Sequence, residues 1–398
     1  MAGGITAPLG FRAAGLHVGI KKPGIPDLAL VVSDVDGPVA GVFTRNRVAA
    51  APVVLDQARL RRGRGRAVVV NSGNANACTG ARGLRDAETM SRLAAQALGL
   101  EPESVLVGST GVIGQYLPMD VIRVGIPALA ARLSRRGGGM AAKAIMTTDL
   151  KPKEYAVQGR IGGKLVTVGG MAKGAGMIHP NMATMLAYLS TDVRISRPAL
   201  QRALREAVEA SFNAISIDGD TSTNDTVLCF ANGLAGNAPL VPASPGFLTF
   251  RRLLTDVCRE LAMQILRDGE GVTKVLAIHV TGARTVAEAR RVGETVATSA
   301  LVKTALFGED ANWGRIMAAV GRSGVRLDQA KIGLSFDGVP IVRNGMSLGP
   351  QAERRIEPIV RRKEFGIDIS LGMGTASACR WTTDLSYDYV KINASYRT

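Results

Sequence analysis

The chain has 398 residues, of which 46% are hydrophobic and only 4% aromatic, and its formal net charge is +16. This length exceeds one small domain and provides an aliphatic core for two lobes or one large α/β domain. The four cysteines and three histidines form no CxxC pair or histidine cluster, so we expect neither a disulfide framework nor a metal site.

The same composition bears on location and partners. No apolar run approaches the roughly 18 residues of a spanning helix, and the first residues lack a basic segment followed by an apolar one. We therefore expect a cytoplasmic protein without membrane contact. Arginine clusters such as residues 59–66 could bind nucleic acid, but none is interleaved with aromatic side chains for base stacking. We interpret the charge as exposed surface and expect no nucleic-acid partner.

The first half of the chain alternates short apolar runs with turns. Residues 28–32, 67–70 and 105–107 are rich in β-branched side chains and are bounded by Gly, Asp or Asn, which predicts buried strands. Residues 84–98 and 121–133 have the spacing of amphipathic helices.

The second half contains longer helical patterns. We predict helices over 198–211, with Ser196 as the N-cap, over 247–267 and over 285–306. Predicted strands cover 274–280, 332–336 and 367–371. Because strands and helices do not alternate strictly, the order indicates a layered α/β or α+β sandwich rather than a Rossmann sheet.

Polar, glycine-bearing clusters follow many of these apolar runs. Such loops at strand ends are where sites are built, although each cluster alone is more typical of a turn. The clusters are VVVNSGNANACTG (68–80), VGSTGVIG (107–114), MTTD (146–149), GGMAKGAGM (169–177), ISIDGDTSTNDT (215–226), DGEG (268–271), NWGR (312–315) and INASYRT (392–398).

Thr184 stands out at the start of an apolar run that resembles a buried strand, directly after the small residue Ala183. High β-propensity is one explanation for a threonine there. The other is a nucleophile whose base is its own α-amine, with a reference pKa of about 7.7–8.0. That chemistry requires a cut between Ala183 and Thr184. From this segment alone, both interpretations stay open.

A family resemblance bears on that choice. GGMAKGAGMIHPNMATMLAYLSTD (169–192) resembles the signature of the ornithine acetyltransferases of arginine biosynthesis. Further motifs follow in the order of that family, so the resemblance covers essentially the whole chain. They are NSGNANACTG, GSTGVIG, MTTD, DGDTSTNDT, GEGVTK, GEDANWGR and INASYRT.

The resemblance implies a fold and a division of the chain. The fold is an N-terminal-nucleophile-like αββα sandwich of the β-aminopeptidase/ornithine acetyltransferase type, with a smaller C-terminal α/β part. Self-cleavage between Ala183 and Thr184 would give an α chain of residues 1–183 and a β chain of 184–398. The smaller lobe would span about 285–398, and two α and two β chains would assemble.

The resemblance also implies a reaction. Thr184 takes the acetyl group from N2-acetylornithine and passes it to glutamate, which is a ping-pong glutamate N-acetyltransferase reaction without a cofactor. The sequence leaves open whether acetyl-CoA is a second acetyl donor, which would add amino-acid N-acetyltransferase activity.

Family motifs assign roles to individual residues. Thr110 and Gly111 occupy the oxyanion-hole positions, where a hydroxyl and a backbone N–H suit a tetrahedral intermediate. The implied substrate-binding residues are Thr147, Lys173, Thr184, Glu270, Asn393 and Thr398.

The sequence is compatible with two other functions. An N-terminal-nucleophile amidase or aminopeptidase of similar architecture would pass the acyl group to water. The related β-aminopeptidases typically use serine, so Thr184 argues against it. A basic nucleic-acid-binding protein would show an affinity that falls steeply with salt.

Overall fold

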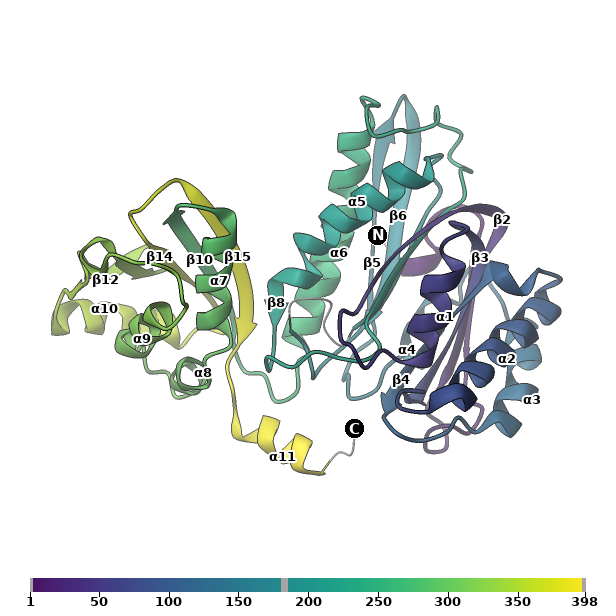
Figure 1. The fold of residues 1–398 in the computed structure, drawn as a ribbon, viewed down its shortest axis with the longest axis horizontal. Coiled ribbons are helices and arrows are strands. Elements are labelled where there is room, and N and C mark those ends of the chain that lie inside the picture. The colour runs from purple at the N-terminus through teal and green to yellow at the C-terminus, as the bar shows by residue number, and fades with distance from the viewer. Residues whose placement is uncertain (1–2, 180–184, 396–398) are drawn as a thin grey trace. The chain divides into compact units, whose positions relative to one another are not determined.

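The computed structural model describes residues 3–179 and 185–395 (Figure 1), and these residues form two compact units. Unit 1 contains the described residues up to Asn213 together with Asp220–Ile265. Unit 2 contains Ala214–Gly219 and the described residues from Leu266 onward. Each unit has its own sheet and core. The boundaries predicted at 183/184 and near 285 stay predictions.

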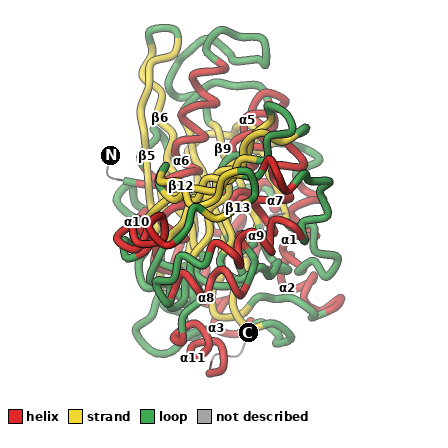
Figure 2. Tube along the Cα trace, turned by 90° about the vertical axis from the view of Figure 1, so that its left-hand side faces the viewer, coloured by secondary structure: helices red, strands yellow, loops and turns green. Residues whose placement is uncertain are grey.

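The described part of unit 1 is organised around an eight-stranded sheet in the order β4-β3-β2-β9-β7-β6-β5, with β1 beside β2. Its strands are β1 (Phe11–Leu16), β2 (Leu28–Phe43), β3 (Arg64–Asn74), β4 (Val105–Val112), β5 (Lys153–Ile161), β6 (Lys164–Lys173), β7 (Leu186–Thr191) and β9 (Thr226–Ala231). The long antiparallel hairpin of β5 and β6 is clear in Figure 2.

Strand β2 joins two halves of this sheet. Its residues 28–32 pair with both β1 and β3, whereas residues 39–43 pair with β9. The register with β3 shifts between Val32 and Gly37. Because the first part of β2 pairs with one half of the sheet and its last part with the other half, the two halves can pack face to face.

The two halves share one buried core. Val31 and Val68 from the β1–β4 half belong to the same apolar cluster as Met171, Tyr188 and Leu228 from the β5–β9 half. Alternate side chains of a strand point to opposite faces, so the neighbouring residues of each strand face away from this inner layer.

Helices cover the two outward faces. In unit 1 they are α1 (Ala51–Arg59), α2 (Gly80–Leu98), α3 (Met119–Ala130), α5 (Arg197–Glu209) and α6 (Phe247–Arg267, whose last residues pass into unit 2). Helix α4 (Gly138–Ala144) instead packs in the inner layer, through Ala141 and Ala142. Val69 and Val107 pack with α2 and α3. On the other half, Gly159 and Gly170 lie against Leu253 and Leu261 of α6. The result is the predicted αββα sandwich, which is therefore confirmed.

The described part of unit 2 has a seven-stranded sheet in the order β13-β12-β11-β14-β10-β15-β8. Its strands are β8 (Ile215–Ser216), β10 (Val275–Ala283), β11 (Gly333–Phe336), β12 (Val339–Arg343), β13 (Met346–Ser347), β14 (Glu364–Ser370) and β15 (Ala376–Thr383). Its helices are α7 (Val286–Ala297), α8 (Ala300–Phe307), α9 (Trp313–Gly321), α10 (Pro350–Val360) and α11 (Tyr387–Ser395).

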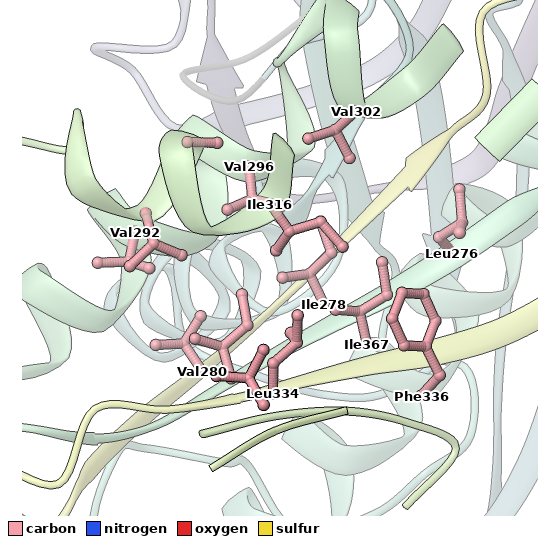
Figure 3. Close-up of a cluster of buried hydrophobic side chains, with 14 of the residues drawn as sticks. Leu276, Ile278, Val280, Val292, Val296, Val302, Ile316, Leu334, Phe336 and Ile367 are labelled. Atoms are coloured by element: carbon pink, nitrogen blue, oxygen red, sulfur yellow. The ribbon is translucent and has the colours of Figure 1, made fainter. Parts of the chain in front are cut away.

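The core of unit 2 lies between its sheet and its helices. Figure 3 shows Ile278 of β10 and Ile367 of β14 in one cluster with Val296 of α7 and Ile316 of α9. These four side chains are at most 1% exposed. Their aliphatic character agrees with the low aromatic content of the chain.

The single helix predicted over 285–306 is wrong. The chain instead forms α7 and α8, separated by Thr298 and Ser299. The Ser299 side chain accepts a hydrogen bond from the backbone N–H of Val302, so it begins a new helix. The other predicted helices and strands are present. No helix in the described ranges has the length and apolarity to span a membrane.

Candidate active site

Gly111 lies at the end of β4, where that strand meets β3. Its φ is +131°, and a Cβ there would lie 2.3 Å from the carbonyl carbon of Gly73. Strand pairing places Gly73 opposite Gly111. Only glycine fits this close approach without displacing the backbone, so the two glycines bring β3 and β4 together at this edge.

Thr110 comes directly before Gly111 in β4, and its side chain is buried, with 4% of the residue exposed. Its Oγ1 accepts a hydrogen bond from Lys173 Nζ at 3.3 Å. A threonine hydroxyl has one proton to donate as well as lone pairs to accept. Within the described ranges the Thr110 hydroxyl donates no hydrogen bond. Its proton is therefore available for an oxygen that develops negative charge.

Lys173 ends β6 and is 3% exposed. It lies near Asp149, which forms a buried ion pair with Lys153 at 2.6 Å. Burial alone would raise the pKa of Asp149, but Lys173, Lys153 and the N–H of Gly174 outweigh it and lower that pKa to about 2. Asp149 is therefore a carboxylate near neutral pH.

The same carboxylate positions the loop that carries Thr147. The Thr147 backbone N–H donates to Asp149 Oδ2 at 3.0 Å, and the Gly174 N–H donates to Oδ1 at 2.7 Å. Asp149 thus holds the backbone at Thr147 and at Gly174, the residue after Lys173. Both residues were predicted to bind substrate.

Ala183 and Thr184 lie outside the described residues, but Met185 does not. Its N–H donates to Asp225 Oδ1 at 3.0 Å, and its carbonyl accepts the N–H of Thr226 at 3.2 Å. Asp225 is fully buried, and this burial raises its pKa well above the usual value. Both backbone groups of Met185, the residue after Thr184, are therefore hydrogen-bonded to the Asp225–Thr226 segment.

Asparagine Asn224 joins three of the polar clusters. Its Nδ2 donates to the carbonyls of Ala75, at 2.6 Å, and Ser109, at 2.8 Å. The loops over 68–80, 107–114 and 215–226 therefore meet at this amide. Sequence reasoning missed Asn224, Asp225 and Asp149 as organising residues, although each lies in a cluster that it singled out.

Glu270 and Asn393 come together in unit 2. Asn393 Nδ2 of α11 donates to Glu270 Oε2 at 2.9 Å, and Glu270 is 8% exposed. The adjacent Gly271 has a φ of +65°, and a Cβ there would lie 2.4 Å from the backbone nitrogen of Tyr389. This glycine lets the start of α11 approach the Glu270 turn.

The described site residues thus form one group in each unit. Thr110, Gly111, Thr147 and Lys173 lie in unit 1, and Glu270 and Asn393 lie in unit 2. Thr398 is outside the described residues, as are Ala183 and Thr184. Among the described side chains, no group of His, Cys, Asp or Glu could hold a metal ion.

Comparison with known proteins identifies the family. The ArgJ family model matches residues 12–398. The chain belongs to the ArgJ family. Among its relatives, the "Arginine biosynthesis bifunctional protein ArgJ" of Symbiobacterium thermophilum is 52% identical over 100% of this chain and 99% of its own. The protein of the same name from Geobacter sulfurreducens is 52% identical over 98% of this chain and 99% of its own.

A solved structure of the family has a shorter chain. The crystal structure of the Arginine biosynthesis bifunctional protein ArgJ of Bacillus halodurans is 40% identical, with a TM-score of 0.51. The match covers 98% of that chain but 52% of this one. A chain of about half the length of this ArgJ member therefore occurs in that structure.

Proposed function

We propose that this ArgJ member transfers the acetyl group of N2-acetylornithine to glutamate, as a glutamate N-acetyltransferase of arginine biosynthesis. The observation that carries the proposal is the full-length match to relatives that are named for arginine biosynthesis. The same relatives are named bifunctional, which supports acetyl-CoA as a second acetyl donor for glutamate. We propose that the reaction needs no cofactor and that the protein is cytoplasmic.

The chemistry proceeds through an acetyl ester on Thr184. The Thr184 α-amine takes the proton of the Thr184 hydroxyl while the hydroxyl oxygen attacks the acetyl carbonyl. The bond from the acetyl carbon to the ornithine nitrogen then breaks, and ornithine leaves with that proton on its own α-amine. The α-amine of glutamate then attacks the ester, and the Thr184 hydroxyl is regenerated. The Thr110 hydroxyl and the Gly111 N–H stabilise the oxyanion of both tetrahedral intermediates. Lys173 and Thr147 bind the substrate carboxylate, and Glu270, with Asn393 and Thr398, binds the side chain of ornithine.

The nucleophile arises by self-cleavage between Ala183 and Thr184. The β chain of 184–398 would be just over half of the precursor, and the half-length chain in the Bacillus halodurans structure supports such a division. We further propose an assembly of two α and two β chains.

Intact mass spectrometry tests the cleavage. We expect purified protein to give two species that correspond to residues 1–183 and 184–398, and Thr184→Ala to give one uncut species. Labelled acetylornithine should yield labelled acetylglutamate with the wild type alone. An uncut wild type, or a fully active Thr184→Ala, would refute the mechanism. Labelled acetate in place of acetylglutamate would identify an amidase instead.

Asp225 offers a second test of the junction. Asp225→Ala removes the acceptor that holds the Met185 N–H, so we expect self-cleavage to slow by about 10- to 100-fold, as small misplacements of reacting groups do. Asp192, at the other end of β7, accepts the N–H groups of Thr167 and Leu9. Asp192→Ala is the matched control and should still be cleaved. The time course of cleavage after expression at low temperature measures both rates, and equal slowing would contradict a specific role.

A further inference from the structure

Lys21 is a cation beside the predicted oxyanion hole to which no role has been given. It lies in the loop between β1 and β2 and is partly buried. Its side chain lies against the end of β3, because a Cβ on Gly73 would lie 2.9 Å from Lys21 Cγ. Gly73 is the residue paired with Gly111. Lys21 therefore lies next to the site although it is far from it in sequence.

The loop that carries Lys21 is built around one buried carboxylate. Asp27 accepts the backbone N–H groups of Val18, Gly19, Ile20 and Lys21 at 2.7 to 3.2 Å. Four such bonds to one carboxylate fix the loop in a single conformation. The position of Lys21 is therefore defined before any ligand binds.

The ammonium group reaches toward the other site residues. Lys21 Nζ donates to the carbonyl of Pro26 at 3.0 Å and to the carbonyl of Met146, which precedes Thr147, at 2.6 Å. An ammonium has three donors, so the two bonds to described residues leave one for a ligand. Burial lowers the pKa of Lys21 to about 8, with Lys173 also lowering it and Asp27 and Asp149 opposing. Lys21 is thus a cation near neutral pH, close to Lys173.

This edge of unit 1 carries an excess of positive charge. The three lysines Lys21, Lys153 and Lys173 lie near two carboxylates, Asp27 and Asp149, and burial raises the pKa of the nearby Asp225. A net positive edge favours a ligand with more negative charge. Of the two proposed substrates, glutamate has two carboxylates, whereas N2-acetylornithine has one carboxylate and one ammonium.

We propose that Lys21 is a second carboxylate-binding residue beside Lys173 and that it selects glutamate as the acetyl acceptor. This inference rests on the proposed function and assigns a residue to acceptor specificity. Lys21 binds the second carboxylate of glutamate, a group that N2-acetylornithine lacks.

Steady-state kinetics of Lys21→Met test the inference, with Lys22→Met as the control because it removes an equal charge from the adjacent exposed residue. We expect the KM for glutamate to rise about 10-fold or more, as the loss of a hydrogen bond to a charged group does. The KM for acetylornithine and the rate of ornithine release should stay within about threefold, since energy changes well under 1 kcal/mol give such factors. Lys21→Arg should recover most of the affinity for glutamate, and Lys22→Met should resemble the wild type.

The outcomes separate the two levels of the proposal. An unchanged KM for glutamate, equal effects on both substrates, or no recovery with Lys21→Arg would overturn the role of Lys21. A wild type that forms acetate and no acetylglutamate would overturn the proposed function instead. Retained release of ornithine shows that the variant is folded. If Lys21→Met fails that check, Lys21→Gln makes the same comparison.

Discussion

Replacing Thr110 by valine should lower kcat by about 10²- to 10³-fold, the usual cost of losing one oxyanion donor. Valine keeps the branched shape of Thr110 but has no proton to donate. The Thr110 hydroxyl only accepts a hydrogen bond within the described ranges, from Lys173, so its donor is unused in the resting site. The loss of this hydrogen bond should cost only about 1 kcal/mol of stability. Single-turnover release of ornithine measures the effect on chemistry directly.

Thr110→Ser is the control, because it keeps the hydroxyl and loses only a methyl group. We expect it to retain kcat within about tenfold of the wild type, a change of 1.4 kcal/mol in barrier. If valine and serine reduce kcat equally, the hydroxyl does not stabilise the oxyanion and the packing of the Thr110 side chain is responsible.

The sequence predicted the elements of the fold well where one apolar pattern dominates. The buried strand β3 was found because it is a short run of β-branched residues bounded by polar ones, and α5 was found because its apolar residues repeat with the helical period. The break between α7 and α8 was missed because Thr298 and Ser299 interrupt a helical pattern by only two residues. Serine is tolerated inside a helix, so only its capping bond to Val302 distinguishes the two cases.

The site was predicted less completely, for a different reason. Family motifs named Thr110, Gly111 and Lys173, and the structure brings these three together in unit 1. The residues that hold them in place, such as Asp149 and Asp225, act through bonds to backbone groups of other segments. Such bonds leave no periodic signal in the sequence, because they depend on which loops the fold brings together.

Lys21 is the clearest example of that limit. In the sequence it is one of two adjacent lysines, and nothing local distinguishes it from Lys22. The four N–H groups gathered by Asp27 turn the first lysine toward Met146, while the second stays exposed. Its relation to Gly73 exists only after β3 and β4 have formed.

Removing the carboxylate of Asp149 should strongly destabilise unit 1. Asp149→Ala removes the carboxylate that pairs with Lys153, which is 1% exposed, and breaking such a buried pair costs about 3–5 kcal/mol. The double variant Asp149→Leu/Lys153→Met should recover much of this loss, because neither side chain is charged. Urea denaturation of the single and double variants measures both values. A double variant no more stable than Asp149→Ala would show that the carboxylate bonds to Thr147 and Gly174, rather than the ion pair, dominate.

The carboxyl group of Asp149 should also make the free energy of unfolding fall at acidic pH. The folded-state pKa of Asp149 is about 2, below its ordinary 3.8. Its contribution to stability is therefore complete above about pH 4 and is lost as the pH falls toward 2. The wild type should lose stability across this window more steeply than the double variant, which has no carboxylate at position 149 to protonate. Because Asp149 also holds the backbone of Thr147, protonation should release the predicted substrate loop together with Lys153. Urea denaturation of the wild type and the double variant between pH 2 and pH 5 measures the difference in stability.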